Sequence, residues 1–220
     1  MKLSAMTWME VEAYLERDDR VVLPTGSTEQ HAYLSLCTDA ILAERVALEA
    51  ARPLGVPVCP VVPFGVSPYF AAYPGTVTIG EETYAAYLAD ALASLVGSGF
   101  RRLLVVNGHG GNRAALESLR GWADAQAGVT LRWHDWWRAP ETRAEVDEID
   151  ATGSHANWME SFPWTRVAGA DVPVEMKPIP DLSDRAELTP EQLRERLGDG
   201  SFGGAYQRAD EVMLELWEVA

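Results

Sequence analysis

The chain has 220 residues, of which 47% are hydrophobic and 23% are charged, and its formal net charge at pH 7 is −15. This length favours one domain over residues 1–220 with a substantial core. The negative charge argues against nucleic-acid or anionic-membrane partners, because both bind clustered positive charge. No apolar run approaches ~18 residues, and residues 1–10 lack the pattern of a signal peptide, so a cytoplasmic protein without a membrane span is expected.

Apolar and amphipathic segments alternate through the first half of the chain. Residues 7–10, Thr-Trp-Met-Glu, form a capping box that opens a helix. The spacing of apolar residues predicts strands at 20–24, 56–62 and 76–79 and helices at 39–52 and 81–96. The prolines within 56–62 favour an edge or irregular strand there.

The same alternation continues to about residue 137. Residues 101–106 are the clearest buried strand, and Asn112 after the glycine loop is a candidate N-cap for a helix over 113–126. A further strand is predicted at 129–133. Residues 163–190 show little periodicity and fit a lid, an oligomer arm or a surface loop, and 198–204 is a glycine-rich loop between helices at 190–197 and 205–219. This order predicts an α/β domain with a mostly parallel sheet.

Polar side chains follow two of the predicted strands. Glu29 and His31 come after the strand at 20–24, and His109 comes after the strand at 101–106. Ligands collect at the carboxyl ends of strands in open α/β sheets. An extended backbone at 29–31 would point both side chains to one side, and Asp39 can fold back towards them from a helix start. Imidazoles and carboxylates suit zinc, manganese or iron, so the pattern predicts a metal-dependent hydrolase.

Each candidate also has a simpler interpretation. Glu29 and His31 fit a polar loop with a capping role, and Asp39 alone fits a helix N-cap. His109 fits an exposed residue of a tight turn. The glycines on both sides of His109 favour a functional site there, because they let a ligand approach the backbone closely.

The segment 155–161 contains the remaining polar candidates. His155 and Glu160 are five residues apart and need not share a helix face. Glu160 fits a metal ligand and His155 a proton shuttle, although both also fit a solvated helix end. Trp136, Trp137 and Trp158 fit packing residues, and aromatic side chains beside polar loops can also form the walls of a small, flat pocket.

Taken together, these segments resemble the creatininase family of metal-dependent amidohydrolases over residues 20–165. The matching pieces are 24–31, 36–39, 63–67, 73–76, 107–112 and 155–161, and the Gly-Ser-Thr-Glu-Gln-His and Asn-Gly-His-Gly-Gly-Asn pieces are specific in combination. The resemblance implies a three-layer α/β/α sandwich with two divalent ions, zinc above all and otherwise manganese or iron. It also implies a homo-oligomer, often a hexamer. The implied metal ligands are Glu29, His31, Asp39, His109 and Glu160, with Asp39 bridging the two ions.

The implied reaction is hydrolysis of a C–N amide bond in a small molecule by a water that two metal ions activate. Catalytic roles fall to His155, as the proton donor to the leaving nitrogen, and to Glu160. Backbone N–H groups of Gly110 or Gly111 would hold the oxyanion. The residues expected to contact substrate are Gly110, Gly111, Trp136, Trp137 and Trp158.

Several departures from the family pattern concern the pocket rather than the ligands. Residues 32–35 form a link one residue shorter than usual, Cys37 replaces a glycine, and Tyr69-Phe70 stands where many relatives have histidine. These differences argue against creatinine as the substrate. A cyclic amide, a formamide with a phosphate held by Arg113 or Arg138, and a peptide trimmed at one end all stay open. A non-catalytic metal-binding assembly subunit is the alternative from another class.

Overall fold

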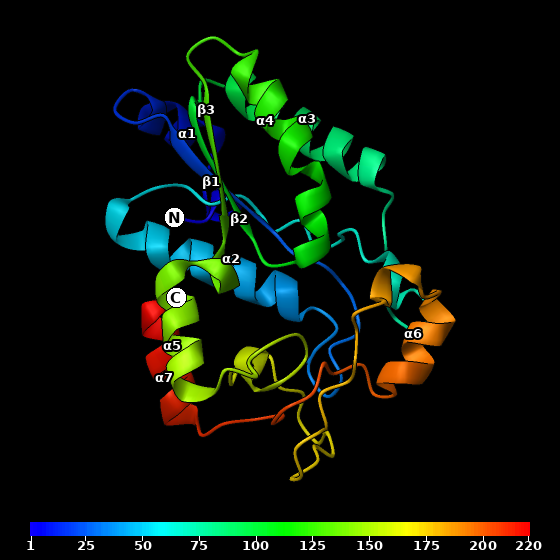
Figure 1. The fold of residues 1–220 in the computed structure, drawn as a ribbon. Helices are drawn as coiled ribbons and strands as arrows, with labels where there is room; N and C mark the ends of the chain where they lie inside the picture. Colours follow the sequence, from blue (N-terminus) through cyan, green and yellow to red (C-terminus); the bar gives the residue numbers. More distant parts are fainter.

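A three-stranded parallel sheet forms the centre of the protein (Figure 1), which a computed structural model describes over residues 1–220. The strands pair in the order β1 (Arg20–Thr25), β2 (Arg102–Asn107) and β3 (Thr130–Asp135). The register places Thr25 opposite Asn107, and Asn107 opposite Asp135. All three carboxyl ends therefore lie at the same edge of the sheet, and the prediction of a parallel sheet is confirmed.

Helices cover both faces of the sheet, because alternate residues of the buried strand β2 point to opposite sides. Leu103 and Val105 pack with one group of helices, and Val106 packs with the other. The first group is α1 (Trp8–Leu15), α3 (Glu81–Gly97) and α4 (Leu116–Asp124). The second group is α2 (Thr38–Ala51), α5 (Pro140–Asp150) and α7 (Asp210–Val219). The result is the expected three-layer α/β/α sandwich.

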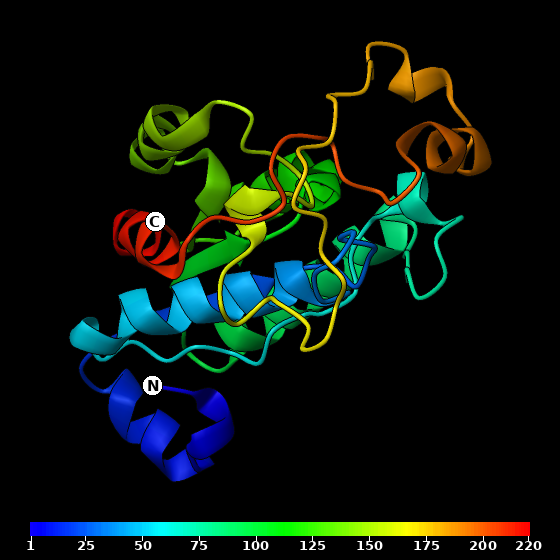
Figure 2. The same ribbon diagram turned by 90° about the horizontal axis from the view of Figure 1, so that it is seen from below.

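One helix lies apart from these layers. Figure 2 shows α6 (Pro190–Leu197) to one side of the sandwich, beside the short 3₁₀ turn Pro68–Phe70. Leu193 and Leu197 of α6 form a small separate core with Phe70 and Tyr73. This satellite core lies next to the carboxyl edge of the sheet and contributes to the wall of the cavity described below. None of the helices combines the length and the apolar character needed to cross a membrane.

The structure corrects several predicted boundaries. Segments 56–62 and 76–79 form only isolated bridges, such as Val58 with Val22 and Val62 with Thr25, because prolines interrupt the first segment. The helix expected at 113–126 begins as a 3₁₀ helix at Gly110–Ala115, so Asn112 is not its N-cap. The terminal helix begins at Asp210 rather than 205, and α5 was not predicted.

Two predicted helix starts have different outcomes. The Thr7 side chain accepts a hydrogen bond from the Glu10 N–H and completes the expected capping box of α1. Asp39 does not cap α2, because Cys37 occupies the N-cap position and Asp39 lies in the first turn with a buried side chain. The buried carboxylate is therefore available for the site.

Candidate metal centre

The five carboxylates and imidazoles expected as metal ligands lie together at the carboxyl edge of the sheet. The loop after β1 supplies Glu29 and His31, the first turn of α2 supplies Asp39, and the loop after β2 supplies His109. Glu160 comes from the 3₁₀ turn Trp158–Glu160. Three overlapping groups have ligand atoms within 4.8 Å of one another: Glu29, His31 and His155; Glu29, Asp39 and His109; His31, Asp39 and Glu160.

Asp39 belongs to two of these groups and faces each with a different oxygen. Its Oδ2 lies 3.0 Å from Nδ1 of His109, and its Oδ1 lies 3.1 Å from Nε2 of His31. Glu29 Oε1 is 3.3 Å from His109 Nδ1, and Glu160 Oε2 is 3.7 Å from His31 Nε2. The arrangement has two sides that share one carboxylate.

Several of these atoms are buried without a hydrogen-bond partner. They are Oε2 of Glu29, Nε2 of His31 and Oδ2 of Asp39. An unpartnered buried polar atom costs free energy comparable to a lost hydrogen bond, and a buried charge costs more. A cation between the carboxylates and the imidazoles would satisfy all three atoms, so the residues fit the mixed nitrogen and oxygen set that divalent transition metals take.

Backbone carbonyls orient the two imidazoles. The Nε2–H of His109 donates to the carbonyl of Val66 at 2.8 Å, and the Nδ1–H of His31 donates to the carbonyl of Glu29 at 3.1 Å. Because a carbonyl only accepts, each bond directs a proton to the nitrogen that faces away from the carboxylates. The other nitrogen, Nδ1 of His109 or Nε2 of His31, then offers its lone pair to the site, as metal-binding histidines commonly do.

The electrostatics of the centre attract positive charge. Burial lowers the pKa of His31, but the carboxylates of Asp39 and Glu160 outweigh it and raise the pKa to about 10. His109 also has a raised pKa, because Glu29 and Asp39 outweigh its burial. Burial raises the pKa of Glu160 to about 7. Protons and divalent ions therefore compete for the same nitrogen atoms, and metal binding displaces protons.

His155 lies at the margin of the centre and is held by Gln30. The Gln30 side-chain amide accepts from the Ala32 N–H at 3.1 Å and donates to the Gly200 carbonyl at 3.1 Å, which defines its orientation. The Nε2 of Gln30 then donates a hydrogen bond to Nε2 of His155 at 2.8 Å. The proton of the neutral imidazole consequently sits on Nδ1, which is 3.8 Å from Oε1 of Glu29. Burial lowers the pKa of His155, which favours this neutral form.

A pair of buried asparagines positions the loop that carries His109. The Asn107 side chain donates to the His109 carbonyl at 2.7 Å and to Asp135 Oδ1, at the end of β3, at 2.8 Å. Asn112 donates to the Gly26 carbonyl after β1 at 3.0 Å and accepts from the Val66 N–H at 3.1 Å. These bonds tie the loop to both neighbouring strand ends, which accounts for the two asparagines of the Asn-Gly-His-Gly-Gly-Asn segment.

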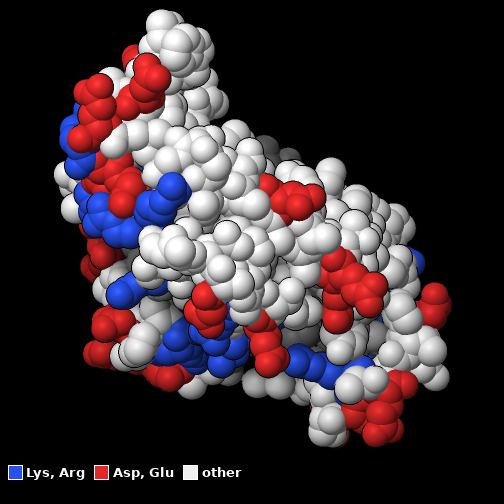
Figure 3. Space-filling view, turned by 90° about the horizontal axis from the view of Figure 1, so that it is seen from above, with Lys and Arg blue, Asp and Glu red and all other residues white.

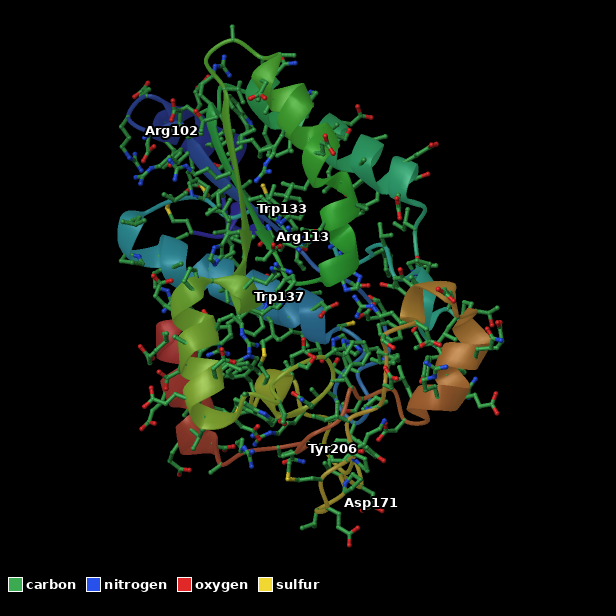
Figure 4. All side chains as sticks on the ribbon, viewed as in Figure 1. Arg102, Arg113, Trp133, Trp137, Asp171 and Tyr206 are labelled. Carbon is green, nitrogen blue, oxygen red and sulfur yellow. The ribbon has the colours of Figure 1, made fainter.

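Above the candidate ligands lies a cavity of about 520 Å³. Gly110, Gly111 and Trp137 line it, and their contact with a substrate stays a prediction. Figure 4 shows Trp137 near the carboxyl end of β3. The structure corrects the expectation for the other two tryptophans. Trp136 is 1% exposed and Trp158 is 0% exposed, and both pack in the core between the sheet and helices α2, α5 and α7. They are packing residues and do not reach the cavity.

Other residues of the site were not among the sequence candidates. The Val66 carbonyl accepts a hydrogen bond from His109, and the Gln30 side chain donates one to His155. Both residues lie in segments that carry the family resemblance, but neither was itself a candidate. Phe70 stacks on the His155 ring at a centroid distance of 4.7 Å. Arg143 and Arg185 line the cavity from segments in which no sequence signal marked them.

Several known proteins are similar to this chain in sequence. A family model described as creatinine amidohydrolase matches residues 4–218. A mycofactocin precursor peptide peptidase from Mycolicibacterium smegmatis is 32% identical over 177 residues, which is 77% of this chain and 66% of the relative. A 3-dehydro-scyllo-inosose hydrolase from Thermotoga maritima is 33% identical over 107 residues, 48% of this chain and 34% of the relative. The chain thus matches between about one third and two thirds of these relatives' length.

Solved structures extend the agreement to the fold. A crystal structure of creatinine amidohydrolase superposes with a TM-score of 0.74 at 21% identity, covering 99% of this chain and 92% of the other. A manganese creatininase has a TM-score of 0.71 at 22% identity, covering 98% and 93%. The parallel sandwich and the family model over nearly all residues lead to one conclusion: this chain belongs to the creatininase family.

Proposed function

We propose that this protein is a metal-dependent amidohydrolase that cleaves a C–N amide bond in a small molecule. The observation that carries the proposal is the division of Asp39 between two sets of ligands, with one oxygen towards His31 and the other towards His109. Glu160 completes one set and Glu29 the other. A shared carboxylate between two such sets is the form expected of a site for two ions.

The remaining residues are assigned roles by their positions around the cavity. When bound, two divalent ions would polarise the amide carbonyl and lower the pKa of a water molecule. His155 would take up the proton that the attacking water releases and, as an imidazolium, would transfer a proton to the departing nitrogen. Gly110 and Gly111 begin a helical segment and line the cavity, so their N–H groups would stabilise the oxyanion. Trp137 would contact the organic part of the substrate.

A second candidate function is the trimming of a short peptide at one end. The similarity to the mycofactocin precursor peptide peptidase, over 77% of this chain, favours it. The ligands and the chemistry would be the same, since a peptide bond is also a C–N amide. Only the part of the cavity beyond the ligands distinguishes the two candidates.

The experiment replaces His109 by alanine. We expect the variant to lose at least one bound ion per chain by elemental analysis, and its activity to fall about 10³-fold or more on a panel of lactams, formamides and short peptides, because the site loses a ligand. His134, on β3 and outside the three ligand groups, provides the matched control His134→Ala. Retention of both metal and activity in His109→Ala would refute the metal site. A fully metallated wild-type protein inactive on the whole panel would favour a metal-binding assembly subunit.

A further inference from the structure

Four arginines line the cavity above the candidate metal ligands: Arg113, Arg138, Arg143 and Arg185. They come from the 3₁₀ helix after β2, the 3₁₀ turn after β3, helix α5 and the segment before α6. The acidic residues that line the cavity are the three ligand carboxylates, Glu29, Asp39 and Glu160. Positive side chains thus surround the space that a substrate would occupy.

Two of these arginines already have acidic partners, and two do not. Arg113 pairs with Asp135, and Arg143 pairs with Asp147. Arg113 lies near the carboxyl end of β2 (Figure 4). Arg138 and Arg185 are exposed and make neither an ion pair nor a side-chain hydrogen bond. Their guanidinium donors are therefore available to a ligand.

The chain has 33 acidic and 18 basic side chains, yet half of its arginines, Arg120 and Arg132 among them, form no ion pair. The lack of an acidic partner therefore does not by itself distinguish Arg138 and Arg185, and their position in the cavity does. Along one edge in Figure 3, Lys and Arg lie directly against Asp and Glu. Arg20 and Arg102, for example, both pair with Asp18. Arg138 and Arg185 differ because no acidic side chain other than the metal ligands lines their cavity.

The charge of the site favours an anion. Three carboxylates do not neutralise two divalent ions, so the loaded site adds no negative potential to oppose the arginines. A guanidinium group matches the planar fork of a carboxylate or the oxygens of a phosphate, and such charge-assisted hydrogen bonds are stronger than neutral ones. A cavity of about 520 Å³ is of the size that binds small molecules.

We propose that the substrate is a small amide that carries an anionic group, a carboxylate or a phosphate, and that Arg138 and Arg185 bind this group while the amide lies at the metal centre. The proposal rests on the amidohydrolase function proposed above. Arg143 reaches the Gly153 carbonyl at 3.3 Å and stays tied to α5 by Asp147, so it supports the cavity wall. For a peptide substrate, the anionic group would be the terminal carboxylate.

The test uses pairs of formamides that differ only in the anionic group. N-formyl-β-alanine is compared with N-propylformamide, and phosphorylated N-formylethanolamine with N-formylethanolamine. The proteins are the metal-loaded wild type, Arg138→Gln, Arg185→Gln and the matched control Arg120→Gln, an exposed arginine on α4 outside the cavity. The measured quantities are kcat and KM for each pair, together with the thermal midpoint and the metal content of each variant.

We expect the wild type to prefer an anionic member by about tenfold or more in kcat/KM, mainly through KM. Arg138→Gln and Arg185→Gln should each lower kcat/KM for the anionic member about tenfold and leave kcat/KM for the neutral member unchanged. Arg120→Gln should change neither. The preferred anion identifies the source of the group as a carboxylate or a phosphate. Equal rates for neutral and anionic members, or equal losses on both in the arginine variants, would overturn the proposal.

A binding measurement separates this proposal from the proposed function. If the wild type hydrolyses none of the compounds, calorimetry measures the affinity of N-formyl-β-alanine for the metal-loaded wild type and Arg138→Gln. The metal contribution is common to both proteins, so a loss of about tenfold in the variant supports the anion site although the proposed function has failed. Equal affinities overturn the anion site.

Discussion

At the scale of the residue, hydrogen bonds to the backbone determine what each histidine offers to the site. His31 and His109 each donate one ring proton to a carbonyl and present the opposite nitrogen to the carboxylates. His155 instead accepts a hydrogen bond from Gln30 and retains a proton on Nδ1. Three residues of one type therefore have two different hydrogen-bond patterns, and their neighbours establish the difference.

A different single side chain, Asp18, makes stability depend on pH. Arg20 binds it through the side chain and the backbone, Arg102 adds an ion pair at 2.9 Å, and the pKa of Asp18 falls from its usual 3.8 to about 2. A carboxylate with a lowered folded pKa stabilises the protein above its unfolded pKa, and this contribution is lost as pH falls from about 4 to about 2.

We therefore expect Asp18→Asn to lower the free energy of unfolding at pH 7 by about 1 kcal/mol, a value reduced for the solvent around the partner arginines. Urea unfolding at several pH values measures this difference, which should shrink below about pH 4 and vanish near pH 2. A difference that stays constant down to pH 2 would show that the ion pair does not stabilise the fold. Asp124→Asn, at the end of α4, is a control without an ion pair.

At the scale of the element, the first turn of α2 packs directly on the ends of β1 and β2. A Cβ atom on Gly26 would lie 2.4 Å from the Ala40 backbone nitrogen, and one on Gly108 would lie 2.3 Å from the Asp39 carbonyl oxygen. Only glycine permits this approach. The contact brings the Asp39 carboxylate between His31 and His109, so helix packing itself places the side chain that two of the candidate ligand groups share.

Replacing Gly108 by alanine should therefore displace the start of α2 and with it Asp39. We expect the free energy of unfolding to fall by about 2 kcal/mol, as for an overpacked core, and the metal content to decrease. Chemical unfolding and elemental analysis measure the two effects. Gly110→Ala is the matched control, because a Cβ there meets nothing within 4 Å. If both variants keep the stability and metal content of the wild type, the close contact does not position Asp39.

At the scale of the whole molecule, the candidate ligands join parts of the chain that are far apart in sequence. Glu29 and Glu160 are separated by more than half of the chain, and the cavity also takes residues from the segment before α6. Ions bound there would link the loops after β1 and β2 to α2 and to the turn at Trp158–Glu160. Metal binding should therefore stabilise the entire fold.

Removal of the metal ions by a chelator should accordingly lower the thermal midpoint. A ligand at about 100 times its Kd adds about 2.7 kcal/mol, which corresponds to roughly 5–10 °C for a domain of this size. Scanning calorimetry before and after chelation measures the shift. His109→Ala should show a much smaller shift than the wild type, and His134→Ala a similar one. An unchanged midpoint after verified loss of the ions would contradict a stabilising role.

The segment from 163 to 190 remains the least regular part of the molecule. Figure 4 shows Asp171 at the tip of a loop that projects away from the sheet. Val174 is 102% exposed and Ile179 is 65% exposed, while Arg185 further along lines the cavity. The beginning of the segment is thus a projecting loop and its end forms part of the cavity wall. The homo-oligomer and the hexamer stay predictions.

Much of the site could be predicted from the sequence because three of the four polar segments directly follow a strand or begin a helix. Glu29, His31, Asp39 and His109 needed only a parallel sheet to meet, since parallel strands bring their carboxyl ends to one edge. Glu160 depended on the family resemblance, because nothing in its own segment indicates where the chain returns to that edge.

The amino-acid sequence by itself determined the α/β class and the parallel sheet and indicated four of the five candidate ligands, because periodicity and strand-end position are local properties of the chain. Only the tertiary structure decided that Trp136 and Trp158 are core while Trp137 faces the cavity, since burial depends on which helices cover a residue. It also decided that Arg138 and Arg185 lack partners, because an ion pair forms between groups that meet in space and leaves no trace in sequence spacing.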